Sequence, residues 1–130
     1  MAVYTGQRKA DLLALRWDAL QDGLLNLRQN KTRKELAIPI HRDLMSVLDD
    51  IPRQAVTILT SSKKLPWTES GFRATWRKHC PLPVKQSGLV LHGLRKTAVV
   101  TLLDVGCTDI ELAAINGQSI DMILHYAKRV

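Results

Sequence analysis

Two glycines divide the last third of the chain, residues 91–128, into three apolar segments with helical spacing. Gly106 and Gly117 each follow such a segment, at the position where a left-handed backbone commonly ends a helix. This part of the chain is therefore restricted to short helices joined by tight turns. We expect the helices to cover residues 91–105, 108–116 and 119–127.

Polar residues at the ends of these segments support the same boundaries. Thr108 and Glu111 have the spacing of a capping box, in which each side chain bonds the backbone amide of the other residue. Ser119 can cap the last helix. The first helix is expected to bury one face, made of Leu94, Ala98, Thr101, Leu102 and Val105.

The same stretch carries three side chains suited to chemistry on a phosphate. His92 and Arg95 are three residues apart, so on a helix they place an ionisable ring beside a fixed cation. Tyr126 follows on a basic helical segment near the end of the chain. For this interpretation to hold, the rest of the chain must supply more positive charge and a proton donor.

The first two thirds of the chain predict a small sheet among helices. Apolar and polar residues alternate over 25–27 and 36–40 on either side of a polar turn, which predicts a β-hairpin. Pro39 lacks an amide donor and therefore suits an edge strand. The other predicted elements are helices over 7–20, 42–51 and from 69 onward, a third strand over 55–60, and a loop over 81–90. The predicted fold is α+β and mostly helical, with a small antiparallel three-stranded sheet.

Basic residues gather at two places in this region. The hairpin turn carries Lys31, Arg33 and Lys34, which form either a solvated loop or a finger that contacts phosphates. On the helix that follows Thr68, we expect Phe72 and Trp76 to stack and to face the core. The outer side of that helix is a basic strip: Arg73, Arg77 and Lys78.

The net charge indicates the kind of partner that suits this chain. Nineteen lysines and arginines against twelve acidic residues give a formal charge of +7, which favours a polyanion such as double-stranded DNA. No stretch resembles a membrane span or a signal peptide. Cys80 and Cys107 are too few for a disulfide framework. We expect a cytoplasmic protein that does not contact membranes.

Neither a metal site nor a nucleotide loop is recognisable in the sequence. Two-metal nucleases need several carboxylates that converge on one cavity, but Asp49 and Asp50 diverge on a helix and the other acids considered fall mostly at helix ends. The histidines lack ligand spacing, and no glycine-rich phosphate loop is present. We therefore expect no metal and no cofactor.

A helix-turn-helix module is one alternative for the C-terminal third. Gly117 would form the turn, and the second helix would end at the basic residues Lys128 and Arg129. This alternative predicts a module that binds DNA without catalysis. It does not account for Arg8, for Lys31 or for the pair His92 and Arg95.

Metal-free cleavage of a phosphodiester accounts for more of the candidate residues. A nucleophile can attack phosphorus if cations offset the charge on the pentavalent oxygens, and the guanidinium fork matches phosphate geometry. A lysine or histidine must protonate the departing 5′-oxygen. A tyrosine, with an ordinary pKa of about 10, needs cationic surroundings to react. The chain has candidates for each role.

Four ordered segments resemble the tyrosine recombinase, or phage integrase, family. Residues Thr5–Trp17 look like the family's first box, and Asn30-Lys31-Thr32 on the turn is similar to its lysine hairpin. Leu91–Thr97 resembles the second box, and Tyr126 falls where the family has its nucleophile. The resemblance covers nearly the whole chain. It implies the catalytic domain of a site-specific DNA breaking and rejoining enzyme.

The resemblance also implies a role for each matching residue. Arg8 and Arg95 would clamp the scissile phosphate, and Lys31 would protonate the 5′-oxygen. His92 would assist proton transfer, and Tyr126 would form a 3′-phosphotyrosyl bond. Wider contacts to DNA are expected from Lys31, Arg33, Lys34, Arg73, Arg77 and Lys96.

Three positions leave alternatives open. Asp11 stands where the family usually has glutamate, and taken alone it could form a surface ion pair with Arg8. Gln118 stands where the family has histidine or tryptophan, so we expect a weakened phosphate contact; losing such a donor can cost ~10²-fold in rate. Lys34 shares the turn with Lys31 and could be the acid instead.

The resemblance implies that residues 1–130 are one catalytic domain without the separate N-terminal domain that usually closes around the duplex. Full-length members assemble as tetramers on DNA, so self-association on DNA is expected. Binding by this chain should be weak, should involve phosphates and should fall steeply with salt. The alternatives are a relaxing topoisomerase with the same chemistry and a decayed integrase fragment that binds DNA without cleaving it.

Overall fold

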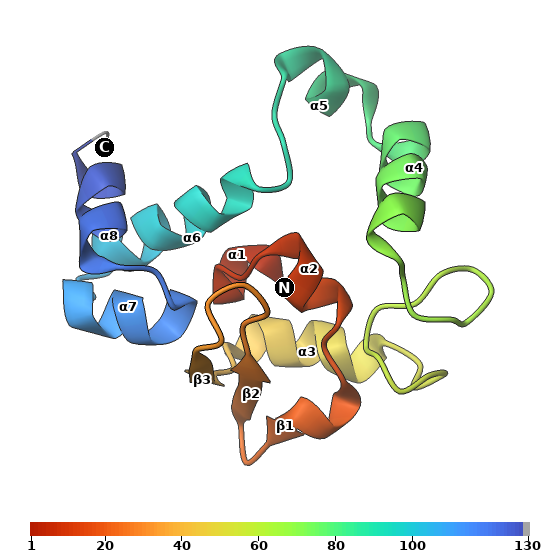
Figure 1. The fold of residues 1–130 in the computed structure, drawn as a ribbon, viewed down its shortest axis with the longest axis horizontal. Coiled ribbons are helices and arrows are strands. Elements are labelled where there is room, and N and C mark those ends of the chain that lie inside the picture. The colour runs from red at the N-terminus through yellow and green to blue at the C-terminus, as the bar shows by residue number, and fades with distance from the viewer. Residues whose placement is uncertain (129–130) are drawn as a thin grey trace.

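A computed structural model describes residues 1–128 as a mostly helical fold with one small sheet (Figure 1). The helices are α1 (Ala2–Thr5), α2 (Lys9–Leu13), the 3-10 helix η1 (Trp17–Ala19), α3 (Arg42–Asp50), α4 (Glu69–His79), α5 (Leu82–Ser87), α6 (Gly93–Asp104), α7 (Asp109–Asn116) and α8 (Ile120–Ala127). The strands β1 (Leu20–Gln21), β2 (Leu24–Arg28) and β3 (Glu35–Pro39) are antiparallel in the order β1-β2-β3. The predicted fold class is confirmed.

The β2–β3 hairpin forms as predicted and buries one face. Leu25 pairs with Ile38 across the hairpin, and the two side chains are 1% and 2% exposed. Residues that alternate with them point outward. β3 is an edge strand, as Pro39 predicted. The turn that joins β2 to β3, residues 29–34, carries the basic residues of the hairpin.

Two apolar clusters stabilise the fold. The first lies between the sheet, α2 and α3, and it includes Leu12, Leu25, Ile38, Leu44 and Ile58. The second has one fully buried residue from each of α6, α7 and α8: Val99, Leu112 and Ile123. α1 packs on α6 and α7 packs on β3, so the clusters are joined side by side.

The predicted helix ends in the last third are confirmed. Thr108 and Glu111 form the capping box of α7, and Ser119 caps α8. The Thr108 amide donates to the Glu111 carboxylate at 2.7 Å, and this hydrogen bond lowers the pKa of Glu111. Gly106 and Gly117 follow their helices with φ of 89° and 70°. These two positions favour glycine because other residues are strained there.

The third strand is not where the sequence predicted it. β1 takes that place beside β2, whereas residues 55–60 make only isolated bridges. The Ile58 amide donates to the Leu15 carbonyl at 2.9 Å, so this segment pairs with the chain that follows α2. The same pairing explains why a helix over 7–20 is wrong: α2 ends at Leu13, and the chain is extended at Arg16 before the 3-10 helix η1 begins.

The segment that links α3 to α6 also differs from the prediction. Phe72 and Trp76 stack, with ring centroids 6.0 Å apart. They do not face the core, because α4 has no buried residue and Trp76 is 38% exposed. The predicted loop over 81–90 contains α5. Both helices lie away from the apolar clusters (Figure 1).

The buried face of α6 is rotated from the predicted one. Ala98 is buried as expected, but Thr101 is exposed and Val105 is 73% exposed. Arg95 and Val99, which were not predicted to be buried, are buried beside Ala98. The difference arises because α6 is covered on two sides, by α1 and by α7 with α8.

Two kinds of feature are not found within residues 1–128. No helix there is both long and apolar enough to cross a membrane. In the same residues, no three histidine, cysteine or acidic side chains gather closely enough to hold a metal ion. Arg129, part of the basic end considered for a helix-turn-helix, lies outside the described residues.

Candidate active site

A cavity of about 400 Å³, hereafter the cleft, lies where four distant segments of the chain meet. Its walls come from the start of α2, the β2–β3 turn, the start of α6, and α8 with the turn before it. The structure brings together all six residues predicted for catalysis, which line this cleft: Arg8, Lys31, His92, Arg95, Gln118 and Tyr126.

Arg95 enters the cleft from α6 and is only 4% exposed. Its Nε donates to the Gly6 carbonyl at 2.6 Å, which orients the guanidinium group. Its Nη2 is buried and has no hydrogen-bond partner within residues 1–128. Burial lowers the pKa of Arg95, and the charge of Arg8 lowers it further, while Tyr126 and Asp11 act in the opposite direction. An anion in the cleft would satisfy the free donor and offset the repulsion.

Arg8 precedes α2 and contributes a second guanidinium group. Its Nη1 is also buried without a partner among the described residues. The surface ion pair with Asp11 is not formed: Asp11 is buried, and its Oδ1 accepts from the Asn30 amide at 2.8 Å. Asp11 therefore holds the lysine turn against α2. Two guanidinium groups in one cleft, each with a donor that is unpaired within residues 1–128, make the cleft suited to a phosphate.

The two lysines of the turn differ in what they contact. Lys34 Nζ donates to the Gly117 carbonyl at 3.2 Å, so its amine is held at the α7–α8 turn. Lys31 is exposed and lines the cleft without a hydrogen bond in the part of the chain that the structure describes. The Lys34 amine is therefore engaged by the protein, whereas the Lys31 amine has no hydrogen bond within residues 1–128.

Gln118 lies in the α7–α8 turn and is 7% exposed. Its backbone amide donates to Asn116 Oδ1 at 2.8 Å, which shapes the turn. Its side-chain Oε1 is buried without a partner among residues 1–128. The side chain thus lies at the cleft, as predicted. It presents an amide where the family has the imidazole of histidine or the indole of tryptophan.

Tyr126 and His92 complete the cleft from opposite ends of the C-terminal third. Tyr126 lies on α8, is half-buried and packs against the cluster around Ile123. His92 immediately precedes α6 and is exposed. The cleft therefore combines a phenol, an imidazole, two lysine amines and two guanidinium groups.

One buried side chain below the cleft was not predicted. Gln29 is 0% exposed and donates to Gln7 Oε1 and to the Asn116 carbonyl. Alternation from Leu25 through Leu27 places Gln29 on the inward face of the hairpin. A polar residue at an inward position was the sequence signal that could have identified it.

The family of this chain follows from comparison with known proteins. The sequence model of the phage integrase family matches residues 1–129. The chain belongs to the phage integrase family. As the sequence resemblance predicted, its fold is that of an integrase catalytic domain.

Relatives of this integrase-family chain are longer. A shufflon-specific DNA recombinase of Escherichia coli is 28% identical over 97% of the chain, which spans 32% of that protein. A lambda integrase tetramer bound to a Holliday junction superposes with a TM-score of 0.75 and 27% identity, over 96% of this chain and 39% of that one. The lambda integrase catalytic core superposes with a TM-score of 0.72 and 26% identity, over 89% of this chain and 74% of that one.

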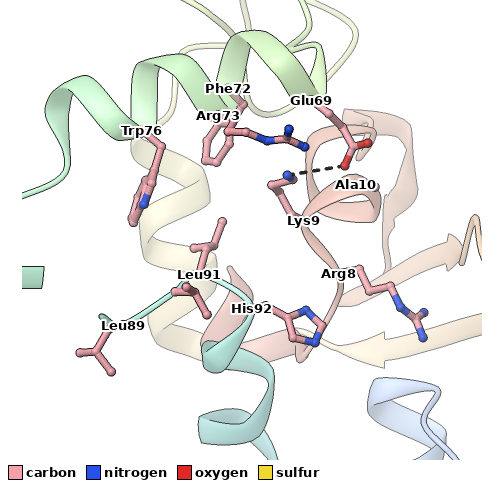
Figure 2. A pocket seen from close by; sticks show the side chains of 11 residues that line it. Arg8, Lys9, Ala10, Glu69, Phe72, Arg73, Trp76, Leu89, Leu91 and His92 are labelled. Carbon is pink, nitrogen blue, oxygen red and sulfur yellow. Dashed lines mark ion pairs between the residues drawn. The ribbon is translucent and has the colours of Figure 1, made fainter. Parts of the chain in front are cut away.

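A second cavity of about 490 Å³ adjoins the cleft in this integrase-family chain, and it shares Arg8 and His92 with it (Figure 2). Phe72 and Trp76 of α4 form its aromatic wall. Lys9 pairs with Glu69 across 3.7 Å, which links α2 to the start of α4.

The predicted DNA contacts are spread over a wider surface. Lys31 and Lys34 lie in the cleft, and Arg73 lines the second cavity. The others lie outside both cavities: Arg33 beside Arg16 and Arg28, Arg77 exposed on α4, and Lys96 on α6.

Proposed function

We propose that residues 1–130 form the catalytic domain of a site-specific DNA recombinase that cuts and rejoins strands through a 3′-phosphotyrosyl intermediate. The observation that supports this most is the convergence of Arg8, Lys31, His92, Arg95 and Tyr126 from distant segments on one cleft. A module that only binds DNA does not need these groups in one cavity. Membership in the phage integrase family is consistent with the proposal.

The proposed reaction uses each of these groups. Arg8 and Arg95 bind the non-bridging oxygens of the scissile phosphate and offset the charge that grows there. The Tyr126 oxygen attacks phosphorus, and His92 assists removal of the phenolic proton. The P–O5′ bond breaks as Lys31 donates a proton to that oxygen. Gln118 donates a weaker hydrogen bond to the phosphate than a histidine would.

The proposed substrate is duplex DNA, and the proposed assembly is a multimer on DNA. One similar structure is a lambda integrase tetramer bound to a Holliday junction. The formal charge of +7 suits this partner. The proposed chemistry needs no metal or other cofactor.

Trapping the covalent intermediate tests the proposal. Binding sites would be selected from a randomised duplex library with the intact gene product. A nick close to the cleavage position then lets the short 5′-hydroxyl fragment diffuse away, so rejoining cannot occur. We expect a protein–DNA adduct that survives denaturation and that forms in excess EDTA. Tight binding to the selected duplex without any adduct would contradict the proposal and favour the binding module.

Binding should depend on salt as expected for phosphate contacts. We expect affinity for duplex DNA to fall by about 10³-fold or more between about 50 and about 200 mM salt if six or more phosphates are contacted. Arg73→Ala should lower the slope of log K against log salt by about 0.9, the contribution of one phosphate. Arg42→Ala is the matched control, because Arg42 lies on α3 outside both cavities. Equal salt slopes for wild type and Arg73→Ala would show that Arg73 does not contact a phosphate.

A further inference from the structure

Gln29 lies directly under the cleft, between the end of β2 and the lysine turn. Its side chain is fully buried and its amide is hydrogen-bonded through both ends. Nε2 donates to Gln7 Oε1 at 2.7 Å and to the Asn116 carbonyl at 2.9 Å. Oε1 accepts from the Thr32 hydroxyl at 2.6 Å. A buried amide with this many partners fixes its neighbours as well as itself.

Each partner of Gln29 is close in sequence to a residue that lines the cleft. Gln7 precedes Arg8, and Thr32 follows Lys31. Asn116 accepts the Gln118 amide at 2.8 Å through its Oδ1. The hydrogen bonds of one side chain therefore connect the three segments that carry the first arginine, the lysine and the glutamine of the site.

The connection continues beyond these first partners. Gln7 Nε2 donates to the Thr5 carbonyl at 2.9 Å and to the Ile115 carbonyl at 3.2 Å. A Cβ on Gly117 would lie 2.6 Å from the Gln29 amide, so the α7–α8 turn packs directly on that group. The turn can approach so closely only because residue 117 has no side chain.

We propose that Gln29 is a positioning residue that sets the place of Lys31 relative to the phosphate-binding arginines. This inference rests on the proposed function. Lys31 itself has no hydrogen bond within residues 1–128, so the position of its amine depends on the backbone of the turn. The Thr32 hydroxyl and the Gln29 amide tie that backbone to the rest of the cleft. A displacement of about 1 Å in a catalytic group can cost ~10²-fold in rate.

The ratio of the cleavage rates for two leaving groups distinguishes loss of the proton donor from general destabilisation, which slows both reactions alike. A duplex with sulfur in place of the bridging 5′-oxygen releases a thiolate, which leaves without a proton because a thiol is far more acidic than an alcohol. Loss of the proton donor should therefore slow cleavage of the oxygen duplex much more than cleavage of the sulfur duplex. Lys31→Ala serves as the reference for this pattern.

We expect Gln29→Leu and Thr32→Val, which remove the hydrogen bonds at similar volume, to slow adduct formation on the oxygen duplex by about 10²-fold. The sulfur duplex should recover most of this loss, as it does for Lys31→Ala. Thr32→Ser keeps the hydroxyl and should retain more activity than Thr32→Val. Gln54→Leu, the same exchange at an exposed position, is the matched control. A wild-type rate for Gln29→Leu, or equal slowing on both duplexes, would overturn the assignment.

Hydrogen exchange of the backbone amides tests the positioning role without requiring DNA cleavage. In Gln29→Leu, the amides of Asn30 and Arg33, which are bonded to Asp11 and to the Gln29 carbonyl, should exchange faster, while those of α3 should not change. Unchanged exchange in the turn would refute the positioning role. If wild type formed no adduct, the proposed function would fail, and the exchange result would still decide whether Gln29 orders the turn.

Discussion

Tyr126→Phe is expected to abolish the covalent adduct with a nicked duplex and to leave DNA binding within about twofold of wild type. The phenol is the proposed nucleophile, and phenylalanine has no atom that can attack phosphorus. Removing a nucleophile from a catalytic triad costs on the order of 10⁶-fold in rate, so no adduct should be detectable. The measurement is a denaturing gel of the trapping reaction with labelled DNA.

Packing makes this substitution a clean test. Tyr126 lies against the cluster formed by Val99, Leu112 and Ile123, and a phenyl ring keeps that contact. The chain offers one matched control, because its two tyrosines are Tyr4 and Tyr126. Tyr4 stacks on His41 with ring centroids 4.9 Å apart, away from the cleft. Tyr4→Phe should form the adduct at the wild-type rate.

Two outcomes would contradict the assignment of the nucleophile. An adduct in Tyr126→Phe would show that another side chain attacks phosphorus. Loss of the adduct in both tyrosine variants would indicate that the ring hydroxyls affect folding or binding, which circular dichroism and a binding assay would show directly.

Local chemistry explains why much of the fold could be predicted. The ends of α7 and α8 depend on Thr108, Glu111, Gly117 and Ser119, whose effects act within one helical turn. The hairpin depends on alternation between neighbouring residues and on a polar turn. Such signals are contained in short stretches of sequence, so they can be recognised without knowledge of the rest of the molecule.

Long-range packing explains the features that were predicted wrongly. Residues 55–60 have a strand-like composition, but their partner is the chain beside Leu15 instead of the sheet edge. The stacked pair Phe72 and Trp76 lines a cavity beside the cleft, where amphipathic spacing alone indicated a core. In both cases the sequence pattern identified an apolar surface and gave no information about what would cover it.

In the site, too, the sequence predicted individual residues but not the contacts between distant segments. The resemblance to integrases identified six residues, and the structure brings all of them to one cleft. It left open which lysine is the acid. The hydrogen bond from Lys34 to the Gly117 carbonyl supports our proposal that Lys31 has this role. Gln29 was missed because its partners are 22 and 87 residues away in sequence.

Gly117→Ala is expected to be the most destabilising of the glycine substitutions considered. Gly117 has φ of 70°, which costs an alanine about 1–2 kcal/mol. The added methyl group would also meet the buried Gln29 amide at 2.6 Å, and such overpacking costs about 1–3 kcal/mol. We expect a total loss of about 2–5 kcal/mol in the free energy of unfolding, measured by urea denaturation, from a typical stability of about 5–15 kcal/mol.

Gly88→Ala separates the two causes of this loss. Gly88 ends α5 with the same φ of 70°, but nothing lies within 4 Å of the position of its added Cβ. It should therefore lose only the backbone contribution of about 1–2 kcal/mol. If both glycine variants lost the same free energy, the Gln29 amide would not be in contact with residue 117.

The double variant Gly117→Ala with Gln29→Ala tests the contact from the other side. Removing the Gln29 amide makes room for the methyl group, so the losses of the two single variants should not add. The double variant should lose less unfolding free energy than the sum of the two single losses, by about 1 kcal/mol or more. Adduct formation should respond differently. Gln29→Ala also releases the Thr32 hydroxyl. The double variant should therefore be more stable than the two single losses predict, while adduct formation on the oxygen duplex stays slower than in wild type. Recovery of both would mean that the amide only fills space below the cleft and does not position Lys31.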